Sequence, residues 1–237
     1  AGFFFMNAAT YLFVIFALMA VHIPAITPDT TQGWRRFTSG ISLAREISGV
    51  SRLLLTLATF SLFSLPYVGL FPAVAHVNFG IAEDGAMYKW LYATWGLGAA
   101  LGGLAIGTKF SHRDQRKLVQ YGFIGFAVSM VFFAISRSAV PAFIFGFILG
   151  FAYFFTTTAM SIVVQSRLKP EMRGRVMSLW FMSFGGTVPL GNMLFGPIVD
   201  QYGARWLLLF GAAWALFLAW WCNVSALDAK NGYLSSK

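Results

Sequence analysis

The sequence predicts an all-α polytopic membrane protein with about seven transmembrane helices. Of its 237 residues, 58% are hydrophobic and only 11% are charged, whereas soluble domains carry roughly 25% charged residues. The hydrophobic residues form runs of the length that a helix needs to cross a bilayer, about 20 residues. No Lys, Arg, Asp or Glu falls near the middle of a run, where each would cost about 2.5–3.5 kcal/mol. A soluble fold is therefore not expected.

The basic residues between the runs predict the orientation of the protein. Fourteen of the 17 Lys and Arg residues fall on the side of the loop that follows the first run, and three fall on the other. Because basic loops stay cytoplasmic, we expect a membrane protein with a cytoplasmic C-terminus. The net charge of +9 then reflects topology, and nucleic acid is not an expected partner. The seven predicted spans are 3–23, 53–74, 86–107, 118–135, 140–164, 176–199 and 206–224.

Four segments follow from this pattern: a single helix (1–23), a linker (24–51), a six-helix bundle (52–225) and a cytoplasmic tail (226–237). The chain begins almost inside a helix, without an initiator Met or a basic n-region. We therefore expect a fragment that lacks upstream spans, and not a signal peptide. In the linker, Trp34, Phe37, Ile41 and Ala44 share one helical face. This spacing predicts an amphipathic helix on the inner membrane surface, with a solvated loop as the alternative.

Glycine pairs inside the spans predict close packing of helices. Gly98 and Gly102 are four residues apart, as are Gly103 and Gly107; small residues at this spacing let two backbones approach. Gly146 and Gly150 repeat the pattern in the fifth span. The three histidines are scattered and the single cysteine has no ligand spacing around it. We therefore expect neither an enzyme nor a cofactor or metal site.

The stretch RLKPEMRGRVMSL, residues 167–179, places basic residues where the sixth span begins. Pro170 and Glu171 are typical of a helix start. Arg173 and Arg175 flank Gly174 against the positive end of the helix dipole, which costs about 0.3–1 kcal/mol for each cation. Attraction to anionic lipid headgroups stabilises each basic residue near the membrane surface by about 1 kcal/mol. These magnitudes alone are consistent with arginines that only anchor the topology.

Residues 165–205 resemble the tenth and eleventh helices of the major facilitator superfamily, in the branch of bacterial drug and siderophore (enterobactin) exporters. By this resemblance the first span corresponds to the sixth helix of that family, and the linker to its central loop. The last six spans correspond to its C-terminal half, with the N-terminal half as a missing partner. The chain departs from the family pattern in the basic loop between the third and fourth spans. There Gly107 occupies a position that is usually acidic. The matching residues are Pro170, Arg173, Gly174, Arg175, Val176, Ser178, Pro189, Leu190, Gly191, Gly196, Asp200 and Gly203.

The resemblance implies a secondary active transporter in the lipid bilayer that exports small amphipathic organic compounds by alternating access. It implies that Pro170, Glu171, Arg173, Gly174 and Arg175 form a conformational latch at the cytoplasmic turn. It also places the substrate cavity against the second and fifth spans. Aromatic and hydroxyl side chains recur there at helical spacing, as suits an amphipathic ligand, although the same residues could simply pack helices. The cavity candidates are Thr56, Phe60, Phe63, Tyr67, Gly146, Gly150, Tyr153, Thr157 and Ser161.

Two other classes of protein remain open from the residues alone. A polytopic scaffold or partner subunit that transports nothing would have the same composition. An intramembrane enzyme is disfavoured because the chain has no paired acids and no nucleophile beside a base. No carboxylate or histidine lies in the middle of a span, so the sequence does not indicate a proton-coupling group.

Overall fold

The computed structural model describes residues 2–20, 40–42, 44–47 and 49–223. The chain divides into two compact units, Ala1–Gln32 and Gly33–Lys237, and the boundary falls inside the predicted linker. The first unit contains α1 (Gly2–Ala20), an apolar helix without charged residues in its first or last turn. The predicted tail and most of the predicted amphipathic helix lie outside the described residues.

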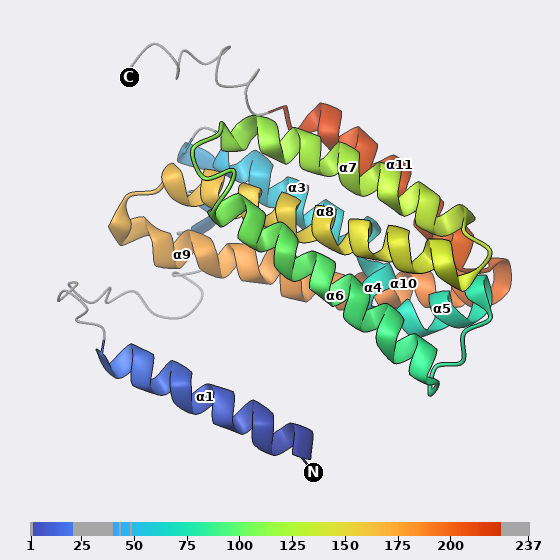
Figure 1. Ribbon diagram of the computed structural model, residues 1–237. Coiled ribbons are helices and arrows are strands. Elements are labelled where there is room, and N and C mark those ends of the chain that lie inside the picture. Colours follow the sequence, from blue (N-terminus) through green and yellow to red (C-terminus); the bar gives the residue numbers. More distant parts are fainter. Residues whose placement is uncertain (1, 21–39, 43, 48, 224–237) are drawn as a thin grey trace. The chain divides into compact units, whose positions relative to one another are not determined.

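The second unit is a bundle of helices that run back and forth between its two ends (Figure 1). The described residues contain no strand, and the predicted all-α polytopic class is confirmed. Three of its helices, α7, α8 and α11, are each long and apolar enough to cross a membrane; a fourth span results if the bent pair Gly40–Glu46 and Val50–Phe63 counts as one. The helices are α3 (Val50–Phe63), α4 (Pro66–Gly69), α5 (Phe71–Phe79), α6 (Ala86–Gly107), α7 (Gln115–Ile135), α8 (Ala139–Ser166), α9 (Pro170–Phe181), η1 (Met182–Gly186), α10 (Thr187–Tyr202) and α11 (Ala204–Trp221).

Four continuous helices, α6, α7, α8 and α11, form the tightly packed part of the unit. Between α6 and α8, a methyl group on Gly98 or Gly102 would overlap the carbonyl oxygen of Phe147 or Phe151, and one on Gly150 would overlap that of Trp95. These three glycines therefore set the helix separation. Gly103 makes only ordinary van der Waals contacts, and no atom lies near Gly107.

The predicted second span is broken into α3, α4 and α5. Pro66 and Pro72 have no N–H, so the carbonyls of Leu62 and Val68 lose their helical donors. The chain turns at Ser64 and Leu65, where both amides donate to the carbonyl of Phe60. Ser64 Oγ also donates to the carbonyl of Gly211 on α11, at 2.8 Å. The prolines thus interrupt the span while Ser64 keeps the break attached to the bundle.

The predicted sixth span is interrupted by one turn of π-helix, η1 (Met182–Gly186), between α9 and α10. Gly185 and Gly186 are poor helix formers, and Pro189 removes the donor that an α-helix would give to the carbonyl of Gly185. Short π-helical turns of this kind occur often at functional sites. Both spans of the unit that contain a proline beyond their first turn therefore deviate from a regular helix.

The basic residues gather at the end of the unit where α6 and α8 end, which we term the basic end. Ten described Lys and Arg residues lie there and three lie at the opposite end. At the basic end, Arg52 of α3 contacts Trp221 of α11. Its guanidinium lies 4.2 Å above the Trp221 ring and donates a hydrogen bond to the Trp221 carbonyl. A cation at this carbonyl stabilises the C-terminal end of α11.

The described part of the linker packs on the bundle. Ala44 belongs to the buried core, and Ile41 packs against it, whereas Arg45 and Glu46 are exposed. The predicted amphipathic pattern therefore holds for this short segment. Its apolar face packs on the core of the bundle, and its position at the membrane surface stays a prediction.

Candidate functional site

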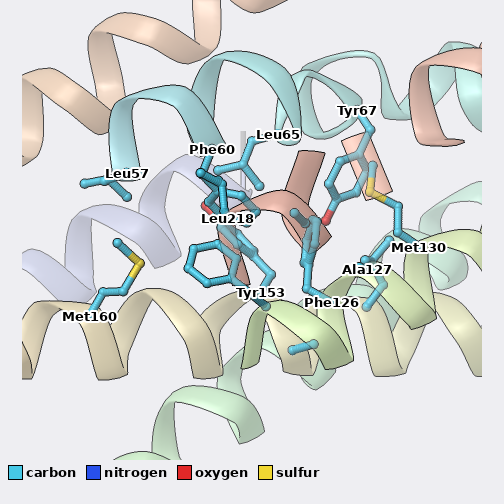
Figure 2. Packing of buried hydrophobic residues seen from close by; sticks show 14 of the residues in the cluster. Leu57, Phe60, Leu65, Tyr67, Phe126, Ala127, Met130, Tyr153, Met160 and Leu218 are labelled. Atoms are coloured by element: carbon cyan, nitrogen blue, oxygen red, sulfur yellow. The ribbon is translucent and has the colours of Figure 1, made fainter. Parts of the chain in front are cut away.

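The structure places most of the predicted cavity residues of the second span in the core. Thr56, Phe60 and Tyr67 have no exposed surface, and Figure 2 shows Phe60 and Tyr67 among the buried side chains around Phe126. Phe60 meets Phe123 and Phe126 edge to face, with centroids 5.1 and 4.9 Å apart. In this conformation these three residues pack helices instead of lining a cavity.

Phe63, the fourth candidate of that span, is half-buried on a different side of the bundle. Its ring makes edge contacts with Phe195, Phe210 and Trp214 of α10 and α11. It therefore belongs to the packing between the first interrupted span and the last two helices.

The predicted residues of α8 divide into two groups. Gly146 and Gly150 are buried at helix contacts, Gly146 beside Phe133 and Leu91. Tyr153, Thr157 and Ser161 follow one another along the helix toward the basic end. Tyr153 is nearly buried, whereas Thr157 and Ser161 are half-buried. Thr157 Oγ1 donates to the Tyr153 carbonyl at 3.0 Å, and Ser161 Oγ accepts from Gln165 at 2.9 Å, so both hydroxyls keep acceptor capacity.

A continuous row of five rings crosses three helices, and only Tyr153 among them belongs to the predicted set. Each neighbouring pair is close to parallel, with interplanar angles of 25°, 29°, 20° and 17° and centroid distances of 6.2, 5.4, 6.0 and 6.4 Å. These separations lie within the 4.5–7 Å range of interacting aromatic pairs. We term this set the aromatic row: Tyr88, Tyr92 and Trp95 on α6, Tyr153 on α8 and Phe184 on η1.

The aromatic row contacts both interrupted spans. Trp95 Nε1 donates to the hydroxyl of Tyr67 on α4, at 3.2 Å. Phe71, which begins α5, packs edge to face on Tyr92 with centroids 5.2 Å apart. Phe184 is part of the π-helical turn itself. The row therefore joins the rigid pair α6–α8 to α4, α5 and η1.

The two interrupted spans also meet each other directly. A methyl group on Gly191 of α10 would press on the carbonyl of Leu62 and on the ring of Pro66, and one on Gly69 of α4 would overlap the amide of Asn192. Asn192 Oδ1 is buried and accepts no hydrogen bond from the described residues. An unsatisfied buried polar group costs about 1–3 kcal/mol, so this contact is not optimised in the conformation observed.

A cavity of about 390 Å³ lies beside the inner turns of both interrupted spans, near the basic end. None of the nine predicted cavity residues lines it. Its walls are mostly apolar, with a few hydroxyls and one arginine: Ile41, Ala44, Arg45, Ser51, Leu54, Leu55, Ala58, Leu179, Met182, Ser183 and Thr187. The space is open to the surface and lies beside the contact that α3 makes with α9 and η1.

The predicted latch residues lie in the first two turns of α9. Pro170 is the first helical residue and Glu171 follows in the first turn. Arg173 and Glu171 are exposed and Arg175 is half-buried; no atom lies near Gly174. The helix thus begins at Pro170, before the predicted start of the span, and the arginines project from within it.

The loop between α6 and α7 holds a local ion pair that reasoning from the sequence did not identify. Asp114 caps α7 by accepting from the Arg116 amide, and its carboxylate lies 2.9 Å from Arg116 Nε. This hydrogen bond holds the pKa of Asp114 below its ordinary value. Among the described residues, no cluster of three His, Cys, Asp or Glu could hold a metal ion.

Taken together, the apolar helices and the basic end define an integral membrane protein with several spans. The family model for the transmembrane secretion effectors of the major facilitator superfamily matches residues 1–232. The chain belongs to this family.

Two curated proteins share a quarter of their residues with this chain over the aligned region. Macrolide efflux protein A of Streptococcus pyogenes is 25% identical over 182 residues, which cover 75% of this chain and 44% of the relative. The protein of the same name from S. pyogenes serotype M6 matches to the same extent. The chain thus spans less than half the length of the curated relatives it matches.

Proposed function

We propose that this chain forms part of an efflux transporter that exports amphipathic organic compounds, such as drugs or siderophores, by alternating access. The observation that carries the proposal is the pairing of two interrupted spans, α3–α5 and α9–α10, in a bundle whose other helices are continuous. Discontinuous helices mark the moving parts and binding sites of many secondary transporters. A passive scaffold has no need of them.

The contact between the interrupted spans supports a moving interface. The buried Oδ1 of Asn192 lacks a partner among the described residues, so a second arrangement that supplies a donor would recover part of this cost. The cavity between α3 and η1 provides space into which η1 can move. Interiors without voids resist such displacement.

The family and its relatives support the direction of transport and the class of substrate. The family is one of secretion effectors, and the relatives are named for macrolide efflux. We propose that the missing partner is the N-terminal half of the same fold and that the basic end faces the cytoplasm. In that orientation, Arg173 and Arg175 of α9 would contact the other half and act as the latch.

Export by the full-length transporter in a strain without its own major efflux pumps tests the proposal. Inverted membrane vesicles should accumulate at least one compound from a panel of macrolides, dyes and siderophores when they are energised. De-energised vesicles from the same preparation are the control. Normal membrane abundance with no energised accumulation of any compound would favour a scaffold or partner subunit.

A further inference from the structure

We propose that the aromatic row is the ligand-binding wall of this unit, and that it takes ligands with a flat ring system, which it recognises by the ring face and not by charge. This inference rests on the proposed function, which it narrows to a class of substrate. It concerns Tyr88, Tyr92, Trp95, Tyr153 and Phe184, four of which were not singled out in the sequence.

The first argument is the geometry of the row. Five near-parallel rings in sequence present their faces and edges along one line that runs from the N-terminal turn of α6 to η1. A core packed only for stability favours edge-to-face contacts as well, and such contacts surround Phe60. The row instead repeats one orientation four times, which matches the way in which a flat ring would join the stack.

The second argument is access to the row. Trp95 and Tyr153 are only 7% and 4% exposed, but Tyr92 is 41% exposed and Tyr88 and Phe184 are half-buried. The row therefore has a fixed, buried centre and open rings on either side of it. Such rings form a pre-organised surface, because the central pair is held by packing and by the Trp95–Tyr67 hydrogen bond.

The third argument is that the helices of the row contain no carboxylate that could pair with a cationic ligand. Neither α6, α8 nor η1 contains a carboxylate, and the acids of the described residues lie at helix ends or in connections. The hydroxyl of Thr157 lies one turn beyond Tyr153, whereas the charged groups near the row, Glu83 and Lys89, lie at its Tyr88 end. Recognition at the centre of the row, Trp95 and Tyr153, therefore comes from ring contacts and hydroxyls.

Binding at this wall would also reach the two interrupted spans. A ring stacked on the open face of Tyr92 reaches α5 through Phe71, and one stacked on Phe184 contacts η1 directly. A ligand can shift a conformational equilibrium only through contacts that differ between the two states. The row provides such contacts, because it joins the rigid pair α6–α8 to the elements that would move.

Ethidium, a flat-ring probe, tests the wall by fluorescence anisotropy with the purified full-length transporter, with empty micelles measured alongside. Replacing Tyr92→Leu or Phe184→Leu should raise Kd by about threefold to tenfold, the worth of one aromatic contact. Tyr92→Phe should recover most of the affinity that Tyr92→Leu loses. Trp90→Leu is the matched control on the same helix: Trp90 is 69% exposed and outside the row, so its loss should leave Kd within about twofold of wild type.

Ionic strength separates recognition of the ring face from recognition of charge. Between about 0.05 and 0.5 M salt, Kd should change by less than about twofold, because salt screens ion pairs and not stacking. Equal Kd values for all variants, or a tenfold weakening with salt, would overturn the inference. If the row variants weaken ethidium binding but wild type exports nothing, the proposed function fails and the wall stands. If wild type exports and the variants bind alike, the wall alone fails.

Discussion

Three glycines at the α6–α8 contact and three glycines in and beyond the π-helical turn η1 have opposite surroundings. Gly98, Gly102 and Gly150 each lie against the backbone of the facing helix. Around Gly185, Gly186 and Gly196, a methyl group would meet nothing within 4 Å. In α6 and α8, glycine permits close approach, whereas in η1 it loosens the helix itself. The same residue type thus marks the rigid part of the unit and its deformable part.

This difference shows how one helical unit can combine a rigid pair of helices with a helix that resists bending less. Helices in a membrane associate through close van der Waals packing, because lipid supplies no hydrophobic drive between them. Where this packing is tight, as between α6 and α8, the pair moves as one body. Where proline and glycine interrupt the helix and no neighbour fills the space, bending costs little. Substitutions that change one region and leave the other intact test whether the two regions differ in rigidity.

The largest effect is expected at the α6–α8 contact. The double substitution Gly98→Ala and Gly102→Ala forces two methyl groups onto facing carbonyls, and each overpacked site costs about 1–3 kcal/mol. Thermal melting in detergent should show a large drop in stability and membrane abundance should fall. Gly96→Ala is the control on the same helix, where no atom lies within 4 Å. Equal stability of the two proteins would contradict the packing account.

A smaller effect on stability, but a clear one on transport, is expected in η1. Gly185→Ala with Gly186→Ala introduces no clash and favours a regular α-helix by about 0.5–1 kcal/mol per residue. The variant should therefore be at least as stable as wild type and export several-fold more slowly. Gly196→Ala, in the regular part of α10 and equally unobstructed, should export normally. Full export by the double variant would remove η1 from the moving parts.

Much of the fold could be predicted because its signals are local. Apolar runs bounded by charges located the continuous helices, and α6 begins and ends where predicted. The glycine spacing in α6 pointed to the contact with α8 that Gly98 and Gly102 make. The breaks in the second and sixth spans were less visible. A proline such as Pro66 is a local signal for a break, but the π-helical turn depends on how Gly185, Gly186 and Pro189 combine with the neighbouring helices.

The aromatic row shows where sequence reasoning fell short. Tyr88, Tyr92 and Trp95 follow at intervals of four and three residues, so their common face on α6 was detectable in the sequence. Phe184 was not, because a π-helical turn rotates the side chains that follow it and periodicity then misplaces them. Phe60 and Tyr67 were assigned to a cavity since aromatic residues suit either role. Only the tertiary packing against α7 decides that they belong to the core.

At the basic turn of α9, export should depend on the planar geometry of the arginine side chains more than on their charge. Replacing Arg173→Lys and Arg175→Lys keeps both charges but removes the planar, bidentate donors of arginine. If the pair contacts the other half as a latch, export should fall by a few fold at normal membrane abundance. Unchanged export at normal abundance would reduce the two arginines to topology anchors.

The smallest effect is expected at Asp114. Its folded-state pKa is lowered by Arg116, so its contribution to stability is present above the unfolded pKa near 4 and is lost as pH falls through the folded value. Asp114→Ala removes both the cap and the charge and should cost about 0.5–2 kcal/mol. Asp114→Asn keeps a capping side chain and should cost less than about 1 kcal/mol, since exposed pairs contribute little. Melting temperatures measured between about pH 3 and 7 should show the pH dependence only with Asp114 intact.

The central claim is that the interrupted spans move against a rigid α6–α8 pair, and pulsed electron paramagnetic resonance on the full-length transporter tests it most directly. One pair of spin labels, at exposed Leu104 and Ser166, reports on α6 and α8 alone. A second pair, at exposed Met87 and Gln201, reports on α10 against α6. The account predicts that adding ethidium redistributes the second distance and leaves the first unchanged. An unchanged second distance in a transporter that exports ethidium, or an equal change in both, would contradict it.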